Sequence, residues 1–175
     1  MRRLPAVLAL ALAGCAAQPY EEPQSGARAR VRFSTDTTNP TLLQQYDDNA
    51  CRTGEREVTR MRGGVLGASD AARELYVAAG KPFYGLFIGS DQRTASRDAT
   101  MGQTTTLLEQ CGVPFAFTFE AGADYEVAFR RAHCRVEISR IQRDAAGKTA
   151  RVAQSTAPMD GMACSKVFEK RRFFH

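Results

Sequence analysis

The sequence predicts an all-β domain, an antiparallel β-sandwich of immunoglobulin-like style with about seven to nine short strands. Three observations predict it. Apolar and polar residues alternate in several short runs, which is the period of a half-buried strand. These runs are separated by turn residues, because the 175-residue chain holds 14 Gly and 7 Pro. Hydrophobic residues make up 43% and charged residues 25% of the chain, a balance that excludes wholesale disorder.

The first expected strand covers residues 27–33, where the alternation has no fault. Its apolar face carries Ala27, Ala29, Val31 and Phe33, and its other face carries three arginines: Arg28, Arg30 and Arg32. We expect the apolar face to lie against the core and the arginines to point into solvent.

A second pair of alternating runs covers residues 113–119 and 125–129, with Gly122 in the connection between them. This spacing predicts a hairpin in which Phe119 faces Tyr125 or Val127. A third run begins at Cys134, and its phase places Phe129 opposite Val136. Three consecutive antiparallel strands are therefore expected.

Shorter strands are expected over residues 42–46, 58–62, 74–78, 83–88 and 149–154, with a turn at 79–82. Residues 69–79 contain good helix formers after Ser69, so a helix is the alternative there, and we favour the strand. Residues 89–110 are polar and rich in Thr, Ser, Asp and Arg, and we expect them to form a long loop.

The first residues have the organisation of an export signal. Arg2 and Arg3 precede an apolar stretch that ends in Leu-Ala-Gly-Cys at residues 12–15. This junction resembles the lipobox of bacterial lipoproteins. The resemblance implies that residues 1–14 are cleaved, that Cys15 carries the lipid, and that the protein resides in the cell envelope. An ordinary secretory signal with an incidental cysteine is the alternative.

Ala16 follows the lipidated position, where Asp would resemble the inner-membrane retention signal, so the lipobox resemblance implies the outer membrane. The residues from 16 to 26 are polar and include prolines, which predicts a flexible tether. Residues 15–26 would then comprise the lipidated cysteine and this tether. Residues 27–175 are then expected to form a single domain.

Further motifs resemble those of small, uncharacterised lipoproteins of proteobacteria. They are an Arg-rich opening strand at 29–33, an Ala-Gly-x-Pro-Phe turn at 79–83 and a Phe-rich strand preceded by a cysteine. A Gly-x-x-Tyr hairpin at 122–125 then leads to a further cysteine. This resemblance implies no known activity.

Four cysteines remain once Cys15 carries lipid, and an even number in an exported protein predicts two disulfides. Cys111 and Cys134 are expected at one end of the same sheet, which favours the pairs Cys111–Cys134 and Cys51–Cys164 among three possible pairings. No metal or other cofactor is expected, because the chain has no Cys-x-x-Cys and His133 beside Cys134 cannot easily share an ion with it.

Catalytic signatures are weak. The two histidines are His133 and the terminal His175, and no Gly-x-Ser-x-Gly or Ser-x-x-Lys motif occurs. The Gly-Lys-Thr at 147–149 lacks the first glycine of a phosphate-binding loop, so a turn is expected there. The adjacent Asp47 and Asp48 are the remaining candidates for a hydrolytic or calcium site. We expect the protein not to be an enzyme.

Arg28, Arg30 and Arg32 form the candidate face for an anionic ligand, with a merely solvated face as the alternative. The expected function is a non-catalytic lipoprotein of the outer membrane that serves as an envelope binding or structural module. Its expected partners are the membrane, through the acyl chains, and an anionic envelope component or periplasmic protein. Nucleic acid is excluded by compartment.

The alternative function is an inhibitor or protective lipoprotein that acts on a periplasmic hydrolase through the loop 89–110. A third hypothesis is a hydrolase that uses Asp47 or Asp48.

Overall fold

The computed structural model describes residues 18–62, 71–98, 103–160, 164 and 171–174, and these ranges contain eleven strands and one short 3-10 helix. In chain order the elements are β1 (Gln18–Pro19), β2 (Arg28–Thr35), β3 (Thr41–Tyr46), β4 (Arg56–Met61), β5 (Ala72–Ala78), β6 (Pro82–Asp98), β7 (Gln103–Thr118), β8 (Asp124–Arg130), η1 (Arg131–His133), β9 (Arg135–Arg143), β10 (Thr149–Gln154) and β11 (Arg171–Phe174). The expected all-β fold is confirmed.

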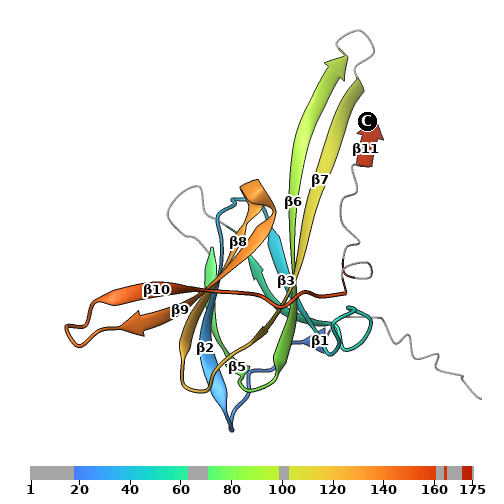
Figure 1. Ribbon diagram of the computed structural model, residues 1–175. Coiled ribbons are helices and arrows are strands. Elements are labelled where there is room, and N and C mark those ends of the chain that lie inside the picture. Colours follow the sequence, from blue (N-terminus) through green and yellow to red (C-terminus); the bar gives the residue numbers. More distant parts are fainter. Residues whose placement is uncertain (1–17, 63–70, 99–102, 161–163, 165–170, 175) are drawn as a thin grey trace, which may run out of the picture.

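The strands form two sheets that pack face to face (Figure 1). The first sheet has the order β1-β4-β3-β6-β7-β11 and the second the order β10-β9-β8-β2-β5. The expectation of a wholly antiparallel sandwich is wrong, because β1 runs parallel to β4 and β2 runs parallel to β8. Strands β3 to β7 intervene between β2 and β8, so no hairpin sets the direction of β2 against β8.

The core lies between the inner faces of the two sheets. Strand β2 alternates as expected, with Ala29, Val31 and Phe33 fully buried and its three arginines exposed. The expected burial of Ala27 is wrong, because this residue precedes the strand and is exposed. Aromatic rings fill the centre. Phe87 of β6 stacks on Phe129 of β8 across the two sheets, with ring centroids 5.4 Å apart, and such pairs stabilise a core beyond the area they bury.

The predicted hairpin between residues 113–119 and 125–129 is wrong. Strand β7 belongs to the first sheet and β8 to the second, so the connection through Gly122 crosses from one sheet to the other. The rings of Phe119 and Tyr125 do contact each other edge to face, with centroids 5.1 Å apart. They are not cross-strand neighbours, because the chain changes sheets between them. The next hairpin is confirmed, because β8 and β9 pair with Phe129 opposite Val136.

The expected loop 89–110 is instead the outer half of the β6–β7 hairpin. Strand β3 pairs with β6 only as far as Gly89, whereas β6 and β7 continue to pair from Gly89↔Cys111 out to Asp98↔Gln103. The two strands therefore leave the sandwich as a projecting arm, which Figure 1 shows rising above the rest of the fold. We call residues 90–98 and 103–110 the hairpin arm.

The other strand predictions are confirmed, including β5 where a helix was the alternative. Both disulfides are present with the favoured pairing, Cys111–Cys134 and Cys51–Cys164, at Cα separations of 5.8 and 5.3 Å. One reason for that pairing is wrong. Cys111 lies in the first sheet, whereas Cys134 lies between β8 and β9 of the second, so their bond joins the two sheets.

Candidate functional site

The predicted arginine face lies on the outer side of the second sheet. Arg28, Arg30 and Arg32 project from β2 at alternate positions and are exposed. Strand β2 lies between β5 and β8, so Arg30 and Arg32 have a strand neighbour on both sides, whereas Arg28 has one only in β5.

The neighbours of these arginines include carboxylates, which the sequence analysis missed. The β2 register places Arg30 opposite Asp124 of β8, and Arg32 between Glu126 of β8 and Glu74 of β5. Opposite charges on adjacent strands favour this register. The outward positions of β8 alternate visibly in the sequence, but only the fold reveals that β8 lies next to β2.

Arg30 and Asp124 form a two-point ion pair. The Arg30 Nε and Nη2 atoms donate to the two carboxylate oxygens of Asp124 at 3.0 and 2.8 Å. The hydrogen bond from Arg30 lowers the pKa of Asp124, and the charges of Arg30 and Arg143 lower it further, against the effect of partial burial. Asp124 is therefore ionised at neutral pH, and the Arg30 guanidinium is occupied.

Arg28 is held in a different way. Its Nη1 atom donates to the Pro23 carbonyl oxygen at 3.2 Å, and its guanidinium carbon lies 4.2 Å from the centre of the Tyr76 ring. This distance is within the range of a cation–π contact. Arg28 therefore anchors the approach to β2 and is not free to take a ligand without losing these contacts.

A shallow groove of about 220 Å³ runs across this face and is lined from all five strands of the second sheet. We call it the sheet groove. Its lining residues are Arg30, Arg32, Glu74, Asp124, Tyr125, Glu126, Ile141, Arg143, Thr149 and Arg151. The groove thus mixes four arginines with three carboxylates, so it is less basic than the arginine face that the sequence indicated.

Within the sheet groove the arginines differ in how they are used. Arg151 of β10 donates from Nε to Glu126 at 2.5 Å, and Arg30 is paired with Asp124. Arg32 makes no ion pair or hydrogen bond with any residue that the structure describes. Arg143 of the groove also makes none, but its charge acts on Asp124, which leaves Arg32 as the cation best placed to receive an added anion.

Asp47 and Asp48, the candidates for hydrolysis, have structural partners. The Arg56 Nη1 and Nη2 atoms donate to Asp47 at 2.6 and 3.1 Å. Asp48 accepts the backbone N–H groups of Ala50 and Thr53, each at 2.8 Å, and the Thr53 hydroxyl. These hydrogen bonds lower the pKa of both carboxyl groups, which suits ion pairing and loop capping and not proton donation at neutral pH.

A cavity of about 540 Å³ lies at the end of the sandwich next to β1. The N-terminal segment from Gln18 to Pro23 forms one wall, and the others include the Asp47–Arg56 pair and residues 81–83. Within the described ranges, the side chains of His, Cys, Asp and Glu form no group of three or more that could hold a metal ion.

Residues 18–23, expected to belong to a flexible tether, make contacts with the domain. Gln18 and Pro19 pair with β4, and the Tyr20 hydroxyl donates to the Tyr76 carbonyl at 2.9 Å. The predicted lipid site Cys15 and the leader 1–14 lie outside the described residues. In the described part of the chain, no helix has the length and apolar character needed to cross a bilayer.

No protein-family model matches this chain, and no curated protein matches it either.

Proposed function

We propose that the protein is a non-catalytic lipoprotein, held in the outer membrane by acyl chains on Cys15, whose domain binds an anionic component of the cell envelope at the sheet groove. The leader and the Leu-Ala-Gly-Cys junction support the anchor. The two disulfides agree with an oxidising compartment. The immunoglobulin-like style of sandwich, which many extracytoplasmic binding modules share, is part of the same proposal and rests on analogy.

The observation that carries the binding proposal is the state of Arg32. It is exposed, lies on the wall of the groove, and has no ionic partner among the described residues, while Arg30 and Arg151 are engaged and the charge of Arg143 acts on Asp124. A guanidinium in this state accepts a carboxylate or phosphate by two hydrogen bonds. The three carboxylates of the groove weaken this attraction and select ligands that also carry donors, such as the amines and hydroxyls of peptidoglycan.

Binding to purified peptidoglycan tests the proposal. We expect the protein to co-sediment with sacculi at low ionic strength and to be released by salt, because exposed charges are screened. Arg32→Ala should weaken binding by about fivefold, which corresponds to roughly 1 kcal/mol.

The matched control is Arg52→Ala, which removes the same charge from the exposed β3–β4 loop and should leave binding unchanged. Equal losses of binding affinity in the two variants would show that the effect depends only on the net charge of the protein. If neither the wild type nor the variants bind sacculi, and the wild type binds vesicles that contain lipid A, the anionic group recognised is a phosphate.

A second candidate function is inhibition of a periplasmic hydrolase, and the hairpin arm favours it. Two paired strands extend from Gly89↔Cys111 to Asp98↔Gln103 without support from the rest of the first sheet except β11. Such an arm has the shape to enter a cleft. Capture of a stoichiometric enzyme from solubilised envelopes, lost when residues 92–108 are replaced by a short turn, would favour this function over the groove.

A further inference from the structure

The N-terminal segment is fastened to the edges of both sheets. The Tyr20 N–H donates to the Glu57 carbonyl of the first sheet at 2.9 Å, next to the β1–β4 pairing. The Tyr20 hydroxyl donates to the Tyr76 carbonyl of the second sheet, and the Tyr76 N–H donates to a Glu22 carboxylate oxygen at 2.8 Å. The segment thereby satisfies backbone groups on the edge strand β5, which would otherwise be open to pairing.

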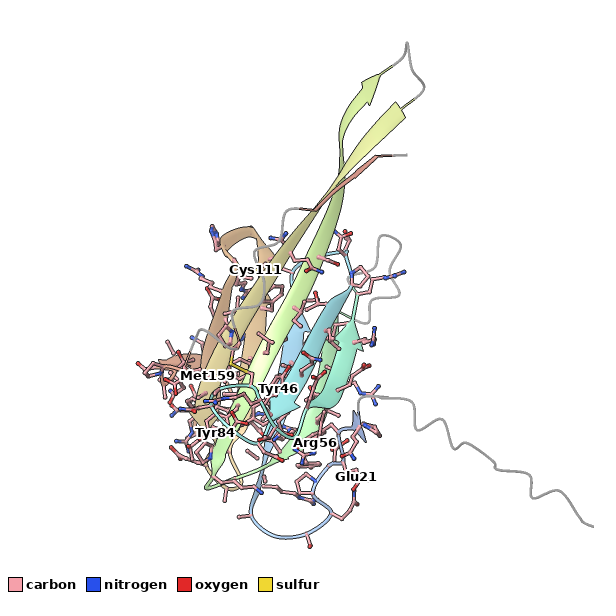
Figure 2. All side chains as sticks on the ribbon, turned by 90° about the vertical axis from the view of Figure 1, so that its right-hand side faces the viewer. Glu21, Tyr46, Arg56, Tyr84, Cys111 and Met159 are labelled. Carbon is pink, nitrogen blue, oxygen red and sulfur yellow. A yellow bond between two sulfur atoms is a disulfide. The ribbon has the colours of Figure 1, made fainter. Side chains whose placement is uncertain are left out.

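This attachment lies at one end of the sandwich, and the register shows which end. Strand β1 pairs with Arg56 and Glu57 at the start of β4. Arg56 pairs with Gln45, and Gln45 pairs with Gly85 near the start of β6. The hairpin arm begins beyond Gly89, at the other end of the same strand. Figure 2 shows Arg56 and Glu21 near the end of the molecule opposite to the arm.

The docked segment shortens the distance over which the chain could hang from a membrane. Three residue steps separate Cys15 from Gln18, and a fully extended chain covers at most about 11 Å in that length. A free tether up to residue 26 would have allowed roughly 36 to 40 Å. The arm, in contrast, contains nine residues of β6 beyond Gly89, which extend about 30 Å as a strand.

We propose that the end of the sandwich that carries β1 faces the lipid surface and that the hairpin arm points away from it. This inference rests on the proposed anchor at Cys15. The membrane-facing end then includes Arg56 and Lys81 together with the acidic Glu21 and Asp47, so its described charges are of both signs. The short link, and not attraction to anionic headgroups, sets the orientation. The hairpin arm remains available to components away from the bilayer.

A chemical anchor tests the orientation separately from natural lipidation. In a chain produced without residues 1–14, and therefore not lipidated, Cys15 is the free thiol, because the other four cysteines form the two disulfides. The protein is coupled through Cys15 to a maleimide lipid in phosphatidylcholine vesicles. A fluorescent amino acid replaces Lys81 in one sample and Ser96 of the arm in another, and quenching by headgroup nitroxide lipids is measured.

We expect strong quenching at position 81 and at least about fivefold weaker quenching at position 96, because nitroxide quenching requires close approach. A variant with about twelve Gly and Ser residues inserted between Ala17 and Gln18 should lose most of the difference. Equal quenching at both positions without the insert, or stronger quenching at 96, would overturn the orientation. A native protein without lipid at Cys15 would refute the anchor but leave this measurement intact.

Discussion

The disulfide between Cys111 and Cys134 joins the two sheets at the level where the hairpin arm leaves the sandwich. Cys111 pairs with Gly89, the last residue of β6 that also pairs with β3. Cys134 follows η1 and has left-handed backbone geometry, with φ of 45°. Cys111 is fully buried, so the bond fixes the base of the arm from inside the core. Figure 2 labels Cys111 at this level.

Loss of this bond should destabilise the domain substantially. The Cys111→Ala, Cys134→Ala variant keeps the Cys51–Cys164 loop but no longer closes the shorter one, and for its sequence separation of 23 residues we expect a loss of about 2–4 kcal/mol in the free energy of unfolding. Urea denaturation of the wild type and the variant measures it. An unchanged midpoint would show that the two sheets hold together without the cross-link.

The alkaline stability should depend on Tyr20. Burial, with a smaller contribution from Glu22, raises the pKa of Tyr20 to about 12. An unfolded tyrosine ionises near pH 10, so the unfolded state releases its proton first and stability falls as the pH rises from about 10 to 12. Tyr20→Phe should make the decline shallower over this range and cost about 1 kcal/mol at neutral pH through the lost hydrogen bond to Tyr76.

Thermal unfolding at a series of alkaline pH values measures this slope. Tyr46→Phe is the comparison, because burial also raises the pKa of Tyr46 to about 12, and the two substitutions together should flatten the decline further. An identical slope in wild type and Tyr20→Phe would mean that Tyr20 is as accessible in the folded protein as in the unfolded chain.

Acid stability should depend on Asp48. The Thr53 hydroxyl and the loop N–H groups lower the pKa of Asp48 in the folded state. Its contribution is therefore present above about pH 4, the ordinary range of an aspartate, and is lost as the pH falls through the folded-state pKa. Asp48→Asn should weaken this acid dependence, followed by circular dichroism during acid titration. Glu21→Gln, which removes an exposed carboxylate without a described hydrogen bond, should not.

Gly89 is required where β6 passes the core. A Cβ atom at this position would lie 2.7 Å from the Phe129 Cε1 atom, closer than packed carbon atoms approach. Gly89→Ala should therefore cost about 1–3 kcal/mol of stability through overpacking. In a Phe129→Leu background the same substitution should cost less, because the smaller side chain leaves space. Equal costs in both backgrounds would place the strain elsewhere.

The sequence predicted strands well wherever one face is buried. In β2 the strict alternation of Ala29, Val31 and Phe33 with arginines reports burial directly, and the structure follows it. The same alternation does not report which sheet a strand joins. Phe119 and Tyr125 are both buried in the core, yet they belong to segments in opposite sheets. The local pattern therefore predicted the buried positions correctly but the strand pairing wrongly.

The arm and the groove could not be predicted for related reasons. Residues beyond Gly89 pair through their backbones outside the sandwich, so they need no apolar face, and a polar run reads as a loop. The carboxylates beside Arg30 and Arg32 come from β5 and β8, and Asp124 is 94 residues from Arg30 in the chain. The arginine face was visible in the sequence, whereas its neutralisation depends on a parallel pairing that local pattern does not encode.

Anchoring through Cys15 is the premise on which the envelope role and the orientation of the arm both depend, and mass spectrometry of the native protein tests it most directly. The full chain is expressed with its leader in a bacterium that processes lipoproteins, and the N-terminal peptide is isolated from membranes. We expect a peptide that begins at Cys15 and carries a thioether-linked diacylglycerol. A chain that still begins at Met1, or a Cys15 with an unmodified thiol, would contradict the account.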